Sequence, residues 1–185
     1  MTITPNASES EKKSPFYEVN EKFCREFEDF ITRKDGKVNG RYNAWSYSIS
    51  GKITKPKPWI LHYRKSTYSG ANLLLTSKYQ NLLTLAEWTT SKTANENDYL
   101  IRKRTITDLI KIWLFKSYKK LEISDRYILI SRTDNSTADR ELMKKLKPLF
   151  QSKEIYKIKS KKDKLVIELR TDKHYFDIFK SISGV

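Results

Sequence analysis

Apolar residues recur every three or four positions after Pro15, and this spacing predicts a first helix of about 18 residues. Ser14 is placed as its N-cap with Pro15 at the first helical position, and Gly36 is placed as its stop. The apolar stripe of this helix consists of Val19, Phe23, Phe27 and Phe30, with Ile31 beside them.

A pattern typical of strands follows. Residues 41–49 alternate between apolar and polar side chains, which predicts one half-buried strand with Trp45, Tyr47 and Ile49 on a shared face. Shorter apolar runs predict further strands at 59–64, 73–79, 82–88, 99–104 and 126–131, and a hairpin of strands at 155–159 and 165–170.

Three more helices are predicted in the second half of the chain. One spans 105–120 with Thr105 as its cap and Asp108 three residues later. Another begins at Ser136 and is ended or kinked by Pro148, and the last spans 172–181. The sequence therefore predicts an α+β fold: a mainly antiparallel sheet of about seven or eight strands with about four packed helices. We expect residues 1–15 to be a flexible polar tail and 16–185 to be a single α+β domain.

The positive charge is concentrated in the middle of the chain. The formal net charge is +15, to which residues 36–120 contribute 16 basic and 4 acidic residues. Such a field attracts nucleic acid, anionic lipid or an acidic protein. However, 27 of the basic residues are Lys and only 10 are Arg, and this excess favours a compositional origin of the charge over a dedicated polyanion site.

Residues 100–121 combine this basic character with apolar and aromatic side chains. On a helical wheel one face holds Ile106, Leu109, Ile110, Trp113, Leu114 and Leu121, while Ile112 and Phe115 fall on another. A helix that is apolar nearly all round is either enclosed in a core or uses its second face for a partner. We favour enclosure, with the net acidic first helix covering that second face, because large exposed apolar patches are rare on monomers. The candidate residues for binding an anionic partner are Arg102, Arg104, Lys111, Phe115 and Lys119.

No motif in the sequence indicates catalysis or metal binding. The only two histidines, His62 and His174, are far apart, and Cys24 lies between phenylalanines as a small buried residue. The five glycines form no phosphate-binding loop, so no cofactor or specific small-molecule ligand is inferred. Without a signal segment or a long apolar run, we expect a soluble cytoplasmic protein, with a location peripheral to the membrane as the alternative.

The sequence thus favours a non-catalytic binding module for an anionic partner, which is nucleic acid, an anionic membrane surface or an acidic protein. A structural or homo-oligomeric protein and an enzyme of unrecognised class remain as alternatives. Nucleic-acid binding would require aromatic and basic residues on an open sheet face, and the candidates are Trp45, Tyr47, Tyr63 and Arg64.

Overall fold

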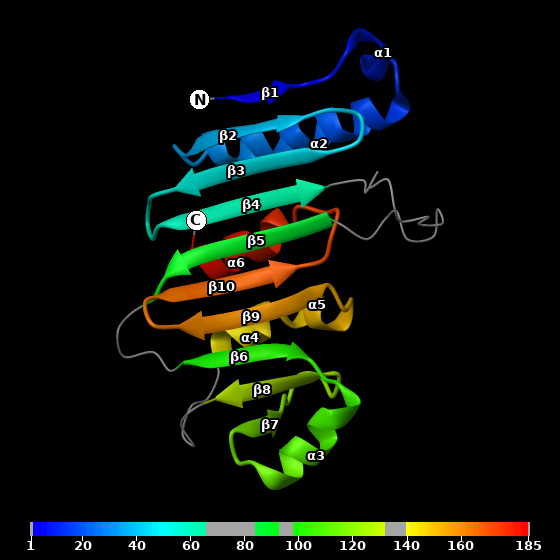
Figure 1. The fold of residues 1–185 in the computed structure, drawn as a ribbon. Coiled ribbons are helices and arrows are strands. Elements are labelled where there is room, and N and C mark those ends of the chain that lie inside the picture. Colours follow the sequence, from blue (N-terminus) through cyan, green and yellow to red (C-terminus); the bar gives the residue numbers. More distant parts are fainter. Residues whose placement is uncertain (1, 66–83, 93–97, 132–139, 185) are drawn as a thin grey trace.

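One long sheet organises the chain. In the computed structural model, which describes residues 2–65, 84–92, 98–131 and 140–184, ten strands follow the order β1-β2-β3-β4-β5-β10-β9-β6-β8-β7 (Figure 1). All neighbouring pairs are antiparallel except β1 and β2, which are parallel. The strands are β1 (Ile3–Pro5), β2 (Lys37–Tyr42), β3 (Tyr47–Ile53), β4 (Trp59–Lys65), β5 (Thr84–Ser91), β6 (Tyr99–Lys103), β7 (Tyr118–Lys120), β8 (Tyr127–Ser131), β9 (Ile155–Lys161) and β10 (Lys164–Leu169).

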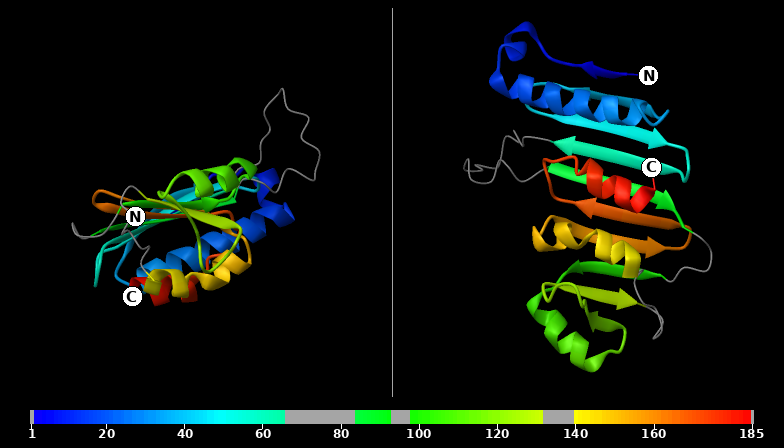
Figure 2. Two further views of the ribbon diagram at one scale, coloured as in Figure 1. Left: turned by 90° about the horizontal axis from the view of Figure 1, so that it is seen from below. Right: turned by 180° about the vertical axis from the view of Figure 1, so that it is seen from behind.

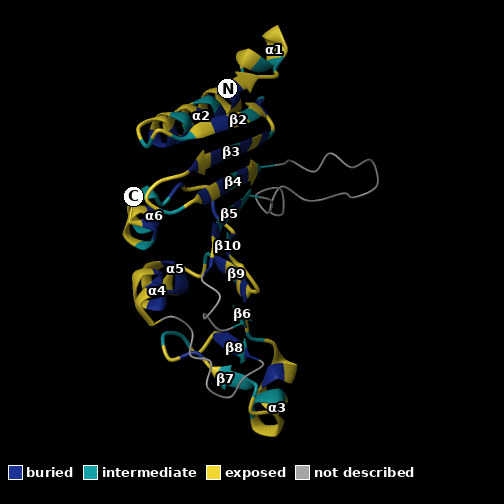
Figure 3. Cartoon of the chain, turned by 90° about the vertical axis from the view of Figure 1, so that its left-hand side faces the viewer, coloured by how far each residue is buried: buried dark blue, intermediate teal, exposed yellow. Residues whose placement is uncertain are grey.

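The helices divide unequally between the two faces of the sheet. They are α1 (Glu9–Lys12), α2 (Pro15–Thr32), α3 (Ile106–Leu114), α4 (Arg140–Lys145), α5 (Lys147–Gln151) and α6 (Phe176–Ser183). Helices α2, α4, α5 and α6 cover one face, whereas α3 lies at the β7 end on the other side (Figures 2 and 3). The hydrophobic core therefore lies between the sheet and the first group of helices.

Aromatic residues dominate this core. Phe179 of α6 packs edge-on against Trp59 of β4 and Trp88 of β5, with ring centroids 5.3 and 5.5 Å apart. The indole of Trp88 donates a hydrogen bond to the hydroxyl of Tyr63 (3.0 Å), which itself donates to the carbonyl of His174 (2.7 Å). These bonds satisfy the polar atoms that aromatic side chains bring into an apolar interior.

The first helix forms as its sequence predicts. Ser14 caps α2 by accepting a hydrogen bond from Phe16 N (3.3 Å), and Pro15 is the first helical residue. Phe27, Phe30 and Ile31 are buried against the sheet, but Val19 is exposed, and the buried stripe also includes Tyr17, Asn20 and Cys24.

The α+β class is confirmed, while the element counts differ, with ten strands and six helices in the described ranges. The single strand predicted over 41–49 was wrong: β2 and β3 form a hairpin there. The turn is set by Asn43, whose side-chain oxygen accepts hydrogen bonds from Trp45 N (2.9 Å) and Ser46 N (2.8 Å). The apolar alternation continues through the turn, and this continuity hides the break in the sequence.

Other differences concern the lengths of elements. Within the expected tail, Ile3–Pro5 pairs with β2 as β1, and Glu9–Lys12 forms α1. The helix expected over 105–120 ends at Leu114 and is followed by β7. The strand expected at 73–79 and the helix start at Ser136 lie outside the described residues. Pro148 lies in the first turn of α5, directly after the break from α4, as predicted. The hairpin of β9 and β10 is also confirmed.

Gly51 of β3 allows α2 to approach the sheet closely. A Cβ atom at this position would lie 2.6 Å from Cγ1 of Ile31 and 2.8 Å from Cζ of Phe27. We expect Gly51→Ala to lower the free energy of unfolding by about 1–3 kcal/mol, because both neighbours are buried and must shift. Urea denaturation would measure this change. Unchanged stability would mean that α2 can move away from the sheet at little cost.

Candidate functional site

Helix α3 is held to the sheet through a buried polar cluster at its start. The carboxylate of Asp108, which is fully buried, accepts hydrogen bonds from Arg102 Nη1 (2.7 Å) and Nη2 (2.8 Å). Thr105 N and Thr105 Oγ1 also donate to Asp108 Oδ2, each at 2.7 Å, so the expected capping arrangement is present. The Arg102 guanidinium, aided by Thr105, holds the pKa of Asp108 well below its usual range.

This anchoring leaves the apolar face of α3 directed to solvent. Asp108 is the only buried residue of the helix. Six large apolar side chains here are 51–87% exposed, and Trp113 and Ile106 are the most exposed of them. Figure 3 shows exposed residues, in yellow, along α3. We call this set the α3 apolar face: Ile106, Leu109, Ile110, Trp113, Leu114 and Phe115.

The expectation that the first helix covers this surface was wrong. Helix α2 packs on β1, β2 and β3, at the opposite end of the sheet from α3 (Figure 1). Of the six residues predicted to share one apolar face, Leu121 alone is buried. Of the eleven large exposed hydrophobics in the described ranges, six belong to the α3 apolar face, so the exposure is concentrated rather than scattered.

The predicted anion-binding residues surround this helix but serve different purposes. Arg102 is occupied by Asp108 and therefore acts as a structural residue in this arrangement. Lys111 lies over the ring of Tyr118, 5.6 Å from its centroid, and Phe115 is exposed beside the same ring. Arg104 follows β6 and is partly exposed, and its backbone N–H donates to the carbonyl of Arg126 (2.8 Å). Lys119 lies on β7 and is also partly exposed.

The charge around α3 is strongly one-sided. Residues 99–121 contain seven Lys and Arg residues and one Asp, which leaves a net charge of 7 − 1 = +6. The single acidic residue of this segment, Asp108, is already paired with Arg102.

A cleft on the open face of the sheet adjoins α3. It has a volume of about 500 Å³, and Leu100, Tyr118 and Ile130 are among the residues that line it. Lys159 and Lys161 of β9 also line it and are exposed, whereas Lys157 is paired with Glu168 at 2.7 Å. Tyr118 joins the cleft to the α3 apolar face through Phe115, with ring centroids 6.2 Å apart.

The aromatic residues proposed for base stacking are not on the open face. Tyr47 and Tyr63 are buried on the helix-covered side, with 4% and 1% of their surface exposed. Trp45 lies in the β2–β3 turn and stacks at a tilt on Phe16, with centroids 5.9 Å apart. Arg64 does lie on the open face, but without either tyrosine beside it.

The groups considered for catalysis are mostly occupied or buried. Cys24 is buried, and burial raises the pKa of its thiol to about 12, which disfavours the thiolate that a nucleophile requires. His62 lies on the open face, with its Nε2 3.4 Å from Oγ of Ser48. Across the described ranges, no cluster of three or more His, Cys, Asp or Glu residues has a geometry suited to a metal ion.

Comparison with family models, curated proteins and solved structures found no match to this chain. None of the helices in the described ranges combines the length and the apolar character that crossing a bilayer requires.

Proposed function

We propose that this protein is a non-catalytic domain that docks on an anionic membrane surface through α3. The observation that carries the proposal is the α3 apolar face, with six large apolar side chains exposed on ten consecutive residues. Helices that lie in a membrane interface bury such a face among the acyl chains and direct basic residues toward the headgroups. The nine residues of α3 span about 14 Å, enough to lie along the interface but not to cross it.

The basic surroundings favour an anionic lipid surface over a second copy of the chain. Pairing of two copies through α3 would bring together two segments that each carry a net charge of +6. An anionic leaflet instead attracts such a segment, by about 1 kcal/mol for each Lys or Arg close to the surface. Lys111 and Lys116 lie on or directly after the helix, and Lys159 and Lys161 flank the adjoining cleft.

The arrangement of the aromatic residues favours lipid over nucleic acid. Trp113 of the α3 apolar face is 84% exposed, and the amphipathic indole of tryptophan favours the boundary between acyl chains and headgroups. Of the aromatic residues considered for base stacking, Tyr47 and Tyr63 are buried beneath the helices, and Trp45 lies in the β2–β3 turn against Phe16. Phosphate contacts made by lysines alone would give binding that salt abolishes, whereas apolar insertion would leave a salt-resistant component.

Vesicle sedimentation tests the proposal. We expect the protein to bind vesicles of phosphatidylcholine and phosphatidylglycerol, and to bind vesicles of pure phosphatidylcholine much more weakly. Replacing Ile110 and Trp113 with Glu should weaken binding at least about tenfold, because two apolar contacts are lost and negative charge is added. Val19→Glu is the matched control, since Val19 is an exposed apolar residue on α2, far from α3.

The outcomes of this experiment are distinct. Binding by the wild type and by Val19→Glu, together with loss of binding by the α3 variant, supports the proposal. A wild type that stays in the supernatant overturns it, as does equal binding by all three proteins. Loss of binding by Val19→Glu alone would place the docking surface on α2 and would also contradict the proposal. Thermal melting should be the same for the three proteins, because all the substituted side chains are exposed.

A further inference from the structure

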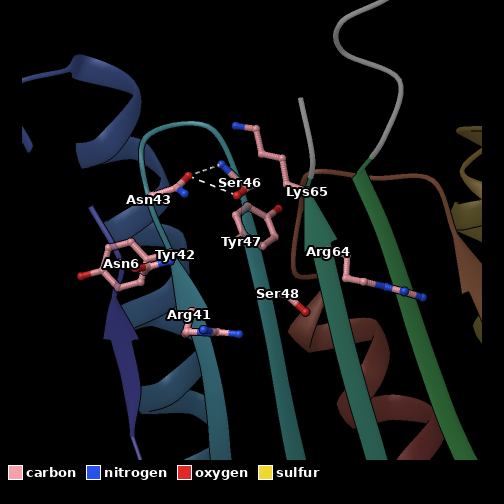
Figure 4. Close-up of a pocket in the computed structure, with 9 residues that line it drawn as sticks. All are labelled: Asn6, Arg41, Tyr42, Asn43, Ser46, Tyr47, Ser48, Arg64 and Lys65. Carbon is pink, nitrogen blue, oxygen red and sulfur yellow. Dashed lines mark hydrogen bonds between the residues drawn. The ribbon is translucent and has the colours of Figure 1, made fainter. Parts of the chain in front are cut away.

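A second basic cleft lies at the other end of the sheet, next to the β2–β3 turn (Figure 4). Its volume is about 370 Å³, and it is lined by Asn6, Arg41, Tyr42, Asn43, Ser46, Tyr47, Ser48, Arg64 and Lys65. Three of these nine residues are cationic and none is acidic. We propose that this cleft binds the phosphoryl group of a small phosphorylated molecule or of free phosphate.

The strand register aligns the two arginines. Arg41 of β2 pairs with Ser48 of β3, and Ser48 pairs with Arg64 of β4, so the three form one row across the open face. Neighbouring strands are separated by about 4.8 Å, which places the two arginine Cα atoms about 10 Å apart. In Figure 4 the side chain of Arg41 extends from β2 toward β3, that of Arg64 extends toward β5, and that of Ser48 lies between β3 and β4.

Both guanidinium groups are available to a ligand. Arg41 and Arg64 are exposed, and neither guanidinium forms a hydrogen bond or an ion pair with any residue in the described ranges. Arginine presents a planar fork of N–H donors that matches the oxygens of a phosphoryl group, and rotation of an exposed side chain costs little.

Lys65 adds a positive charge that no acidic side chain in the cleft neutralises. Its Nζ donates to the amide oxygen of Asn20 (3.0 Å), which is a neutral acceptor. Asn20 is fixed in turn, because its Nδ2 donates to the carbonyls of Asn43 (2.9 Å) and Ala44 (3.1 Å). Partial burial lowers the pKa of Lys65, with Asp172 acting in the opposite direction. Asn20 thus holds the Lys65 ammonium on the α2 side of the sheet, at the rim of the cleft, whereas Arg41 and Arg64 lie on the open face.

The remaining polar groups of the cleft have donors to offer. The side-chain oxygen of Asn43 is used by Trp45 N, Ser46 N and Ser46 Oγ (2.9, 2.8 and 3.1 Å), which leaves its NH₂ group for a ligand (Figure 4). Ser48, whose Oγ lies 3.4 Å from Nε2 of His62, contributes a hydroxyl between the two arginines. Several donors without a carboxylate suit an anion with several acceptor oxygens. The volume is at the small end of ligand pockets, which fits a phosphate ester with a small body rather than a dinucleotide.

Titration followed by ¹⁵N-edited NMR tests the inference in phosphate-free buffer, with inorganic phosphate and glycerol 3-phosphate as probes. We expect saturable shifts of the Asn43 side-chain amide and of the Ser48 backbone amide. The Arg41→Gln/Arg64→Gln variant should bind at least about tenfold more weakly, because both charged forks are lost. The matched control is Lys37→Gln/Lys52→Gln, which removes two charges from an in-register pair elsewhere on β2 and β3.

Asn43→Asp provides a second variant that keeps the turn. An aspartate oxygen can accept the same turn hydrogen bonds, but the NH₂ donor is replaced by negative charge, so we expect binding to be lost while the fold persists. Saturable binding of both probes supports recognition of the phosphoryl group, and binding of inorganic phosphate alone supports free phosphate as the ligand. Linear, non-saturating shifts overturn the inference, as does equal weakening by the arginine and lysine variants. The Ile110→Glu/Trp113→Glu variant should bind the probes with the affinity of the wild type, which separates this site from membrane docking.

Discussion

Replacing Asp108 with alanine is expected to detach α3 from the sheet, at a cost of about 3 kcal/mol in the stability of this helix. The substitution removes four hydrogen bonds, two from Arg102 and two from Thr105. It also leaves the Arg102 guanidinium, whose side chain is 28% exposed, without its anion. Because Asp108 is the only buried residue of α3, little apolar packing opposes the loss.

The effect should therefore appear as local opening rather than global unfolding. Hydrogen exchange would measure it, and we expect the α3 amides to exchange about 100-fold faster while the core strands keep their protection. Asp125→Ala is the control, because Asp125 is an exposed acidic residue in the turn before β8. Equal exchange rates in the wild type and Asp108→Ala would show that the Arg102–Asp108 pair does not hold the helix.

The Arg102–Asp108 pair should also make the attachment of α3 to the sheet depend on pH. The pKa of Asp108 is lowered in the folded protein, so its contribution to stability is complete above the unfolded value near 3.9 and is lost as the pH falls below it. The α3 amides of the wild type should therefore lose protection in acid. The α3 amides of Asp108→Ala should already lack this protection at neutral pH.

Features encoded by neighbouring residues were predictable from the sequence. Ser14 and Pro15 mark the start of α2, and Pro148 marks the break between α4 and α5. Each acts through its own backbone geometry or a hydrogen bond to a near neighbour, so no knowledge of the tertiary structure is required. The β9–β10 hairpin was also predicted correctly, because its two strands follow one another in the sequence and only a short turn separates them.

The direction in which α3 faces could not be predicted. An apolar stripe has the same sequence whether it packs on a core or meets a membrane, and burial in a core is the commoner outcome. The deciding feature is the pairing of Arg102 with Asp108, which turns the polar side of the helix inward. The sequence showed Asp108 as a capping residue, but it gave no sign that the partner would be an arginine on the preceding strand.

The second cleft was missed because it depends on strand register. Arg41, Ser48 and Arg64 are separated by 7 and 16 positions along the chain. They become neighbours only because β2, β3 and β4 pair as a meander through the turn at Asn43. With 41–49 taken as one strand, Arg41 and Ser48 would lie in the same strand rather than opposite each other.

Acid is expected to destabilise the folded protein through His174, and His174→Phe should remove this effect. The imidazole is stacked between Phe23 and Phe176, with ring centroids 3.7 and 4.4 Å away, and 8% of its side-chain surface is exposed. Burial lowers its pKa to about 4. The only carboxylate within 4 Å of it in the described ranges is that of Glu26, 3.7 Å from Nε2 and half exposed.

The direction of this pH effect follows from the difference between the pKa of His174 in the unfolded chain and its pKa in the folded protein. The unfolded chain binds a proton at the ordinary histidine pKa near 6.5, whereas the folded protein binds it only near pH 4. Between these values the unfolded state holds more protons, so a fall in pH favours unfolding. We expect the wild type to lose about 2–3 kcal/mol of unfolding free energy from this group between pH 7 and pH 4.

Urea denaturation at a series of pH values would measure this loss. His174→Phe preserves a flat ring for the stack and has no group to protonate, so its stability should fall less steeply over the same range. At pH 7 it should differ from the wild type by no more than about 1 kcal/mol, because Phe also removes two buried ring nitrogens that lack hydrogen bonds in the described ranges. The control is His62→Asn, which alters a half-buried histidine on the open face and should retain most of the slope. If the unfolding free energies of the wild type and His174→Phe change in parallel with pH, the stacked imidazole is protonated at no cost in stability. Other groups would then account for the acid sensitivity.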